Sequence, residues 1–272
     1  MKLYKIDYTQ KPSSQDEKLF QSVLEKECEG TPIGKKNLRY SYPASIRHFN
    51  SLFPNNHIEL IDYKNDDNTD LQDNIITTIE EFKNLIHKNS TNEQDILRFI
   101  NHKPAFFIPA SITVAGGFTF GHHDLYLFPE FKLGDKYRAD YLLVGSGSGG
   151  YEFIFVEFEK ANGRITLNSG HYGEAIRKGN FQIYDWQSWI EANSDRFYTD
   201  LAQYKGHKDL PDSLKKYDST RFHYVTVAGL RSDYDEVTYR RKRDQKKKED
   251  IVLLHYDNLY DSSLELNNRN SF

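Results

Sequence analysis

Residues 129–160 read PEFKLGDKYRADYLLVGSGSGGYEFIFVEFEK, and this stretch decides the fold that the sequence predicts. Tyr137–Val144 and Tyr151–Glu159 are rich in aromatic and aliphatic residues, and the second segment alternates like a β-strand with two faces. The run Gly145–Gly150 between them consists of glycine and serine, which is typical of a tight turn. We therefore predict two antiparallel strands joined by a hairpin, with Tyr126–Glu130 as the first strand of a meander.

Acidic residues meet at the open end of this predicted hairpin. An antiparallel pair brings Asp140 near Glu157, and Glu157 and Glu159 share a face because side chains alternate along a strand. Crowded carboxylates repel unless a cation or a proton compensates them, and their oxygens suit Mg²⁺ or Mn²⁺. We predict a metal site here. The alternative is a solvated polar edge, which the apolar neighbours Phe155 and Phe158 argue against.

The glycine run also matches the GxGxxG pattern of nucleotide-binding loops. That pattern requires a helix directly after the glycines, so that the helix N-terminus faces the phosphates. Here the residues that follow the run alternate like a strand. The pattern therefore indicates a hairpin turn.

Apolar periodicity predicts the helices. One helix runs from about Leu71 through Ile86, and a second runs from about Asn92 to the residues before Pro104. A third covers about Ser169–Ala192. Its expected buried stripe consists of Ile176, Gly179, Ile183, Trp186 and Ile190.

The C-terminal part alternates between strand and helix. Phe222–Leu230 and Ile251–His255 are β-rich, and the strongly charged segment Glu236–Lys248 between them is helical in character. The order strand, helix, strand predicts a parallel pair joined by a crossover. For residues 1–68 we predict small strands and loops, and the run Asn65–Asp73 is expected to be a linker or an exposed turn.

Composition sets limits on the class of protein. The chain has 272 residues and a net charge of −4, so any surface for nucleic acid must be local. Cys28 is the single cysteine, which excludes an internal disulfide and fits a cytoplasmic protein. No signal-peptide pattern opens the sequence, and no run of about 18 apolar residues occurs, so we expect no membrane association.

Two further charged motifs have ordinary explanations. His122-His123-Asp124 lacks a second ligand pair with zinc-finger spacing, and neighbouring histidines on an extended chain point apart, so surface histidines are expected. The basic run Arg240–Arg243 with Lys246–Lys248 is expected on a solvated helix, with phosphate contact as the alternative. No GK[ST] or GxSxG motif supports an ATPase or a serine hydrolase.

Six segments carry a resemblance to a known family. Taken in order, they resemble the PD-(D/E)XK nuclease core and, more closely, the Shedu anti-phage defence nucleases, over roughly residues 90–262. They are ILRFINHKPAFF (96–107), FKLGDKYRADYLLV (131–144), FVEFEKAN (155–162), AIRKGNFQIYDWQSW (175–189), VAGLRSDYDE (227–236) and LLHYDNL (253–259).

The resemblance implies roles for particular residues. Asp140 and Glu157 would hold one or more Mg²⁺ or Mn²⁺ ions, and the backbone carbonyl of Phe158 would add a ligand. Gln182 lies on the helix that the family places beside the site, where it either contacts the site or bonds to backbone. Glu130 precedes the Asp140 strand, and the alternatives are an approach to the metal and a solvated carboxylate.

Glu159 departs from the family pattern, which usually has lysine at this position. A lysine there would offset developing negative charge, and a glutamate cannot do so. Glu159 would instead bind metal or accept a proton from water, and Lys160, Lys178 or Arg177 would supply the cation.

These observations predict an α/β protein with a restriction-endonuclease-like PD-(D/E)XK core, a mixed sheet flanked by helices, over residues 69–272. Residues 1–68 form an N-terminal extension of unknown role. The resemblance implies a metal-dependent DNA endonuclease of bacterial defence against phage that assembles as a dimer or tetramer. The catalytic set would be Asp140, Glu157, Glu159, Lys160 and Gln182. The alternative is a catalytically degenerate module that binds nucleic acid or a partner protein.

Overall fold

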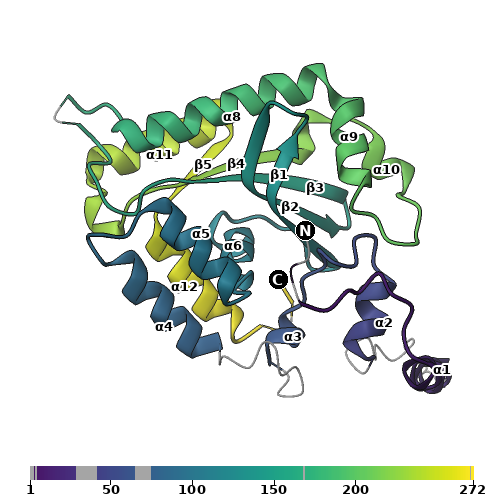
Figure 1. Ribbon diagram of the computed structural model, residues 1–272. Coiled ribbons are helices and arrows are strands. Elements are labelled where there is room, and N and C mark those ends of the chain that lie inside the picture. The colour runs from purple at the N-terminus through teal and green to yellow at the C-terminus, as the bar shows by residue number, and fades with distance from the viewer. Residues whose placement is uncertain (1–2, 4, 29–41, 65–74, 168, 270) are drawn as a thin grey trace.

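A mixed sheet of five strands forms the centre of the molecule, in the spatial order β1-β2-β3-β4-β5 (Figure 1). The computed structural model describes residues 3, 5–28, 42–64, 75–167, 169–269 and 271–272. The first three strands are antiparallel, whereas β4 and β5 run parallel to β3, so the predicted meander and parallel pair are confirmed. The strands are β1 Asp124–Leu133, β2 Tyr137–Gly147, β3 Gly150–Phe158, β4 Phe222–Val227 and β5 Ile251–Leu254.

The turn between β2 and β3 fixes the register of the sheet. Gly147 pairs with Gly150, and Gly150 adopts φ +107°, a conformation that favours glycine. Because β3 begins at Gly150, no helix follows the glycine run, and the hairpin prediction is confirmed. The pairing continues to Tyr141 opposite Val156, which leaves Asp140 next to Glu157.

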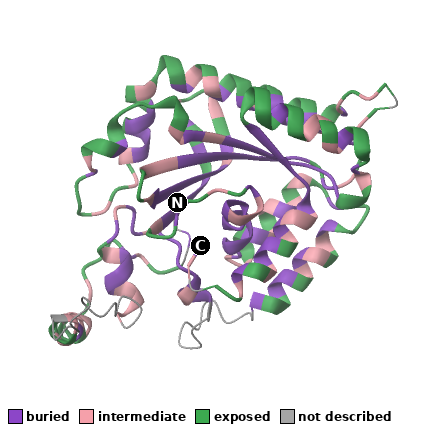
Figure 2. Cartoon of the chain, turned by 180° about the vertical axis from the view of Figure 1, so that it is seen from behind, coloured by how far each residue is buried: buried purple, intermediate pink, exposed green. Residues whose placement is uncertain are grey.

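Helices cover both faces of the sheet (Figure 1). Figure 2 shows the strands buried between helices whose outer faces are exposed. One layer consists of α4 Ile75–Ile86, α5 Glu93–His102, α6 Phe107–Ala110, α7 Ile112–Ala115 and α12 Tyr256–Leu266. The other consists of α8 Glu174–Ala192, α9 Ser194–Ala202, α10 Asp212–Lys215 and α11 Glu236–Glu249.

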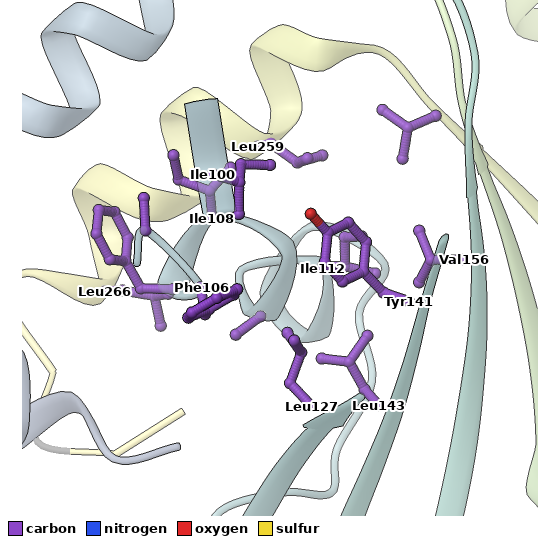
Figure 3. Close-up of a cluster of buried hydrophobic side chains, with 14 of the residues drawn as sticks. Ile100, Phe106, Ile108, Ile112, Leu127, Tyr141, Leu143, Val156, Leu259 and Leu266 are labelled. Atoms are coloured by element: carbon purple, nitrogen blue, oxygen red, sulfur yellow. The ribbon is translucent and has the colours of Figure 1, made fainter. Parts of the chain in front are cut away.

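The core on the α12 side is mainly aliphatic. Alternate residues of β1, β2 and β3 point to this face, where they meet α5, α6, α7 and α12 (Figure 3). All of them are removed from water, which is the main stabilising contribution to such a layer. The residues that Figure 3 labels are Ile100, Phe106, Ile108, Ile112, Leu127, Tyr141, Leu143, Val156, Leu259 and Leu266.

The core on the α8 side is built from aromatic rings. Phe153 stacks on Phe222 with ring centroids 4.7 Å apart, and Phe155 packs against Trp186. The predicted stripe of α8 is confirmed, since all five of its residues are buried. The helix begins at Glu174, later than predicted, because Thr166 and Tyr172 form a bridge and the chain reverses between them.

The N-terminal part differs from the prediction of strands and loops. Its described residues form three helices, α1 Ser14–Cys28, α2 Ala44–Phe49 and α3 Leu60–Lys64. Extended pairing is limited, in the described residues, to a bridge between His57 and Tyr126. The Ser13 hydroxyl accepts the Asp16 N–H at 3.2 Å, so a local cap favours the α1 helix that the sequence reading missed.

Residues 56–58 lie along the outer edge of β1. The Ile58 N–H donates to the Leu125 carbonyl at 2.9 Å, and the Leu127 N–H donates to the Asn56 carbonyl at 2.8 Å. Phe53 and Ile58 are buried in the two main cores. The predicted linker, Asn65–Asp73, lies outside the described residues, and the domain boundary near residue 68 stays a prediction. None of the described helices has the length and apolar character that crossing a membrane requires.

Gly179 lets α8 approach the sheet closely. A Cβ atom at this position would lie 2.8 Å from Thr226 Cγ2 and 3.3 Å from Glu159 Cγ. We expect Gly179→Ala to destabilise the fold, because overpacking costs about 1–3 kcal/mol and the gain in helix propensity is only about 1 kcal/mol. Urea denaturation would measure the change.

The matched control is Arg177→Ala, at an exposed position of the same helix. It should change the free energy of unfolding by less than about 0.5 kcal/mol. Equal stability of the Gly179→Ala variant and the wild type would contradict the close approach.

Candidate functional site

Three carboxylates, from β2, from β3 and from the residue directly after β3, converge on the sheet face that α8 covers. Phe155 packs on α8, and the alternation of β3 therefore directs Glu157 and Glu159 to the same side. Their exposed fractions are only 4% and 2%. Asp140 joins them from β2, where its Oδ2 accepts the Phe158 N–H at 2.7 Å. The structure thus brings the predicted acidic residues together.

Burial and mutual repulsion keep protons on this acidic centre. Burial raises the pKa of Asp140 to about 7 against the opposing Phe158 hydrogen bond, and Glu93 and Glu159 add to the rise. Burial also raises the pKa of Glu157 to about 10, with Asp140 and Glu159 as the next causes. At neutral pH the metal-free site is therefore partly protonated, and the bound protons reduce the negative charge that a cation would otherwise balance.

Helix α8 supplies two polar partners to the acidic centre. The Gln182 amide donates from Nε2 to Glu157 Oε1, so this side chain contacts the site rather than backbone. Lys178 Nζ lies 3.0 Å from Glu159 Oε1 and 3.8 Å from a carboxylate oxygen of Glu93. Burial lowers the pKa of Lys178, but the three neighbouring glutamates outweigh it and raise the pKa overall, so the amine stays charged.

Glu93 is a site residue that the sequence reading missed. It occupies the first position of α5, after the N-cap Asn92, whose side chain accepts the Asp95 N–H at 3.0 Å. Acidic residues are common in a first helical turn, so the sequence gives no separate signal for Glu93. In the structure its charge raises the pKa values of Asp140, Glu157 and Glu159.

A cleft of about 470 Å³ opens beside the acidic centre. Glu93, Glu159 and Lys178 line one part of it, and Lys160 and Arg164 line another. The predicted Lys160 is exposed and lines the cleft, and its charge lowers the pKa of Glu159 without an ion pair between the two described side chains. Of the acidic residues described above, Glu93 and Glu159 therefore face the cleft, whereas Asp140 and Glu157 do not line it.

Two buried tyrosines lie on the side of the site opposite α8. The Tyr256 hydroxyl, at the start of α12, donates to the backbone carbonyl of Glu159 at 2.6 Å. Tyr141 is fully buried beside Asp140, and burial and the Asp140 charge raise its pKa. These contacts fix the end of β3 from the layer opposite α8.

Other candidates lie outside the centre. Glu130 is exposed and pairs with Arg138 at 3.1 Å, and Arg177 is exposed and lines a different hollow. His122 and His123 do not point apart as predicted, because the chain bends there and brings their ring centroids to 4.3 Å. The basic run lies on α11 as predicted, beside α8.

The donor set fits a hard divalent cation, since it consists of carboxylate oxygens that lack a sufficient counter-charge. Among the described residues, no three of Glu93, Asp140, Glu157 and Glu159 have ligand atoms that all lie within 4.8 Å of one another. A bound ion would therefore draw the side chains together, and it would compete with Gln182 for Glu157 and with Lys178 for Glu159.

The fold and site define a mixed α/β protein in which helices flank a five-stranded sheet and a buried acidic centre lies at the end of β3. Residues 90–260 match the family described as "Shedu protein SduA, C-terminal". The chain belongs to the Shedu family, and the matched region contains the whole sheet and every residue of the acidic centre. A search of curated proteins finds no match to this chain.

The raised pKa of Glu157 predicts a pH-dependent stability. A carboxyl whose pKa is higher in the folded state stabilises the fold at low pH, and this contribution is lost as pH rises above the unfolded value near 4.5 towards about 10. Glu157→Gln removes this loss. Without metal we expect the variant to become more stable than the wild type as pH rises from about 5 to 8, by about 1–3 kcal/mol.

Urea denaturation in EDTA at several pH values would measure this difference. Glu130→Gln changes an exposed carboxylate outside the centre and should give a curve parallel to that of the wild type. A Glu157→Gln difference that stays constant or shrinks as pH rises would contradict the assigned protonation.

Proposed function

We propose that this protein is a metal-dependent DNA endonuclease that acts in the bacterial cytoplasm and assembles as a dimer or tetramer. Membership of the Shedu family suggests anti-phage defence. The observation that carries the catalytic part is the buried acidic centre of Asp140, Glu157 and Glu159, beside a cleft with basic residues on its wall. Such a centre destabilises the metal-free fold, which is expected where carboxylates serve a ligand.

Asp140 and Glu157 would hold Mg²⁺ or Mn²⁺. When bound, such an ion stabilises charge on a phosphodiester and lowers the pKa of water. The Phe158 N–H donates a hydrogen bond to Asp140, and the Gln182 amide donates one to Glu157, so both carboxylates have a fixed orientation. Positioned oxygens are needed because ligand geometry decides the strength of such a site.

Lys178 would supply the positive charge that the family usually obtains from a lysine at the position of Glu159. It reaches the centre from α8, and Glu159 holds it there through the 3.0 Å ion pair. Its positive charge would offset the negative charge that develops on the phosphate during attack by water. Glu159 would then act as the residue that positions Lys178, and it would accept the proton of the attacking water once Lys178 moves to the phosphate.

Lys160 and Arg164 would guide the DNA backbone into the cleft. Phosphate contacts by such residues supply sequence-independent affinity that weakens with salt. Helix α11 adds the run Arg240–Arg243 and Lys246–Lys248 on the same layer as α8. These residues favour a DNA substrate over a small phosphate ester.

The first test removes the acidic centre. We expect Asp140→Ala and Glu157→Ala to lower the rate of DNA cleavage in Mg²⁺ or Mn²⁺ by a factor of about 100 or more, since each would remove an ion ligand. Supercoiled, linear and single-stranded DNA should all be assayed. Glu130→Ala, outside the centre, should leave cleavage unchanged. Light scattering of the same samples would test the dimer or tetramer.

A second test addresses the position of the cation. Lys178→Met keeps most of the side-chain length and removes the charge, and we expect cleavage to fall by about 10–1000-fold, the range for loss of one stabilising group. Arg177→Met, one residue away and exposed, is the control. Equal activity of the Lys178→Met variant and the wild type would exclude this role for Lys178.

The second candidate function is a degenerate module that binds nucleic acid or a partner protein. It is favoured by Glu159, which stands in place of the usual lysine and neutralises Lys178. The outcome that identifies it is plaque protection that survives both Asp140→Ala and Glu157→Ala, together with no cleavage of any DNA form by the wild type.

A further inference from the structure

A second group of potential metal ligands lies far from the acidic centre, at the N-terminal side of the sheet. His48 belongs to α2, and His57 and Glu59 belong to the segment that lies along β1. One ligand atom from each residue lies within 4.8 Å of the other two, and all three side chains are buried. Among the described residues, this group of His, Asp, Glu or Cys side chains has its ligand atoms close enough together to hold a metal ion.

His57 is the least satisfied member of the group. It is 1% exposed, and neither of its ring nitrogens has a hydrogen-bond partner in the described part of the chain. Its nearest charged neighbour is Asp124, whose Oδ1 lies 3.5 Å from Nε2. A buried ring nitrogen without a partner is costly, and coordination to an ion would remove that cost.

Both ring nitrogens of His48 face oxygen atoms. Its Nε2 faces Asp62 Oδ2 at 2.5 Å, and its Nδ1 faces the Pro54 carbonyl at 3.2 Å. Ligating histidines usually keep one ring nitrogen on a carboxylate or carbonyl while the other binds the ion, so an ion at His48 would replace one of these two contacts and leave the other in place. The stacked Tyr8 ring, 4.1 Å away, holds the plane of the imidazole.

Glu59 is held in its charged form. Arg47 Nε lies 2.5 Å from Glu59 Oε2, and the same guanidinium contacts Asp62 and the Tyr42 carbonyl. Burial raises the pKa of Glu59, but His57, Arg47 and His48 outweigh it and lower the pKa to about 2.

We propose that His48, His57 and Glu59 bind one divalent transition-metal ion, with Zn²⁺ as the best fit to two imidazoles and a carboxylate. Ligand atoms about 2.1 Å from one ion lie at most about 4.2 Å apart, so the side chains need to close by only some tenths of an ångström. A hollow of about 430 Å³, which His57, Asp124 and Tyr126 line, provides a route of entry.

The ion would fasten the N-terminal part to the sheet. His48 comes from α2, whereas His57 bridges to Tyr126 of β1, so coordination would add to the ion pairs that already join these two segments. We assign the ion a structural role because it would join two segments of the chain through buried ligands.

The test uses the full chain with Asp140→Ala and Glu157→Ala, so that the acidic centre does not contribute metal binding. After EDTA treatment, the protein is loaded with Zn²⁺ or Co²⁺ and freed of excess ion. We expect one ion per chain by mass spectrometry, visible Co²⁺ bands typical of low coordination, and a melting temperature several degrees higher with Zn²⁺.

His57→Ala and the isosteric Glu59→Gln should each lose most of the bound ion and the cobalt bands, whereas His87→Gln, an exposed histidine elsewhere, should retain both. If one of the two variants fails to fold, the other variant and the Zn²⁺-dependent melting temperature of the parent protein still test the proposal. Folded parent protein that keeps no ion, or cluster variants that bind as well as the parent, would overturn the proposal. Neither result depends on whether the protein cleaves DNA.

Discussion

The antiparallel pairing of β2 and β3 is the constraint on which the site depends. The pairing of Gly147 with Gly150 sets the register, and that register places Asp140 beside Glu157. A slip by one residue would turn every side chain of β3 to the opposite face, moving both glutamates into the aliphatic layer and the phenylalanines away from α8. The aromatic packing of Phe155 on Trp186 therefore protects the position of the acids as well as the stability of the core.

The sequence predicted most of this arrangement because its signals are local. The hairpin follows from a glycine run between alternating segments, and the stripe of α8 follows from a period that one helix face determines. Gln182 was a candidate through the resemblance of its helix to that of the Shedu family, and its contact with Glu157 decides between the two alternatives left open for it. Glu93 could not be predicted as a site residue from the sequence. Its helix α5 belongs to the layer that contains α12, and an acidic residue in a first helical turn has an ordinary explanation. The sequence could not decide between Lys160, which follows Glu159 directly, and Lys178, which lies on the next helix. Only the tertiary structure shows that Lys178 forms the ion pair with Glu159.

The two polar clusters balance their charge in different ways. Around Glu59, an arginine is built into the cluster, and the carboxylate stays ionised. Around Asp140 and Glu157, Lys178 is the lysine that forms ion pairs with the acidic groups in the described part of the chain, and burial and mutual repulsion leave the carboxyls protonated in the absence of another cation. The second arrangement is unfavourable for stability, and a fold tolerates it where the missing charge arrives with a ligand.

The segment at residues 56–58 has a consequence for how this protein can be divided. The region that matches the Shedu family begins at residue 90, so a fragment cut there would keep all five strands but lose the backbone partner of β1. The Leu127 N–H and the Leu125 carbonyl would then lie on an open edge. Such an edge is a template for pairing with another chain, so aggregation of the isolated fragment would follow from this exposed strand. The fragment would also lack Phe53 and Ile58 and the buried face of α4, which complete the two main cores.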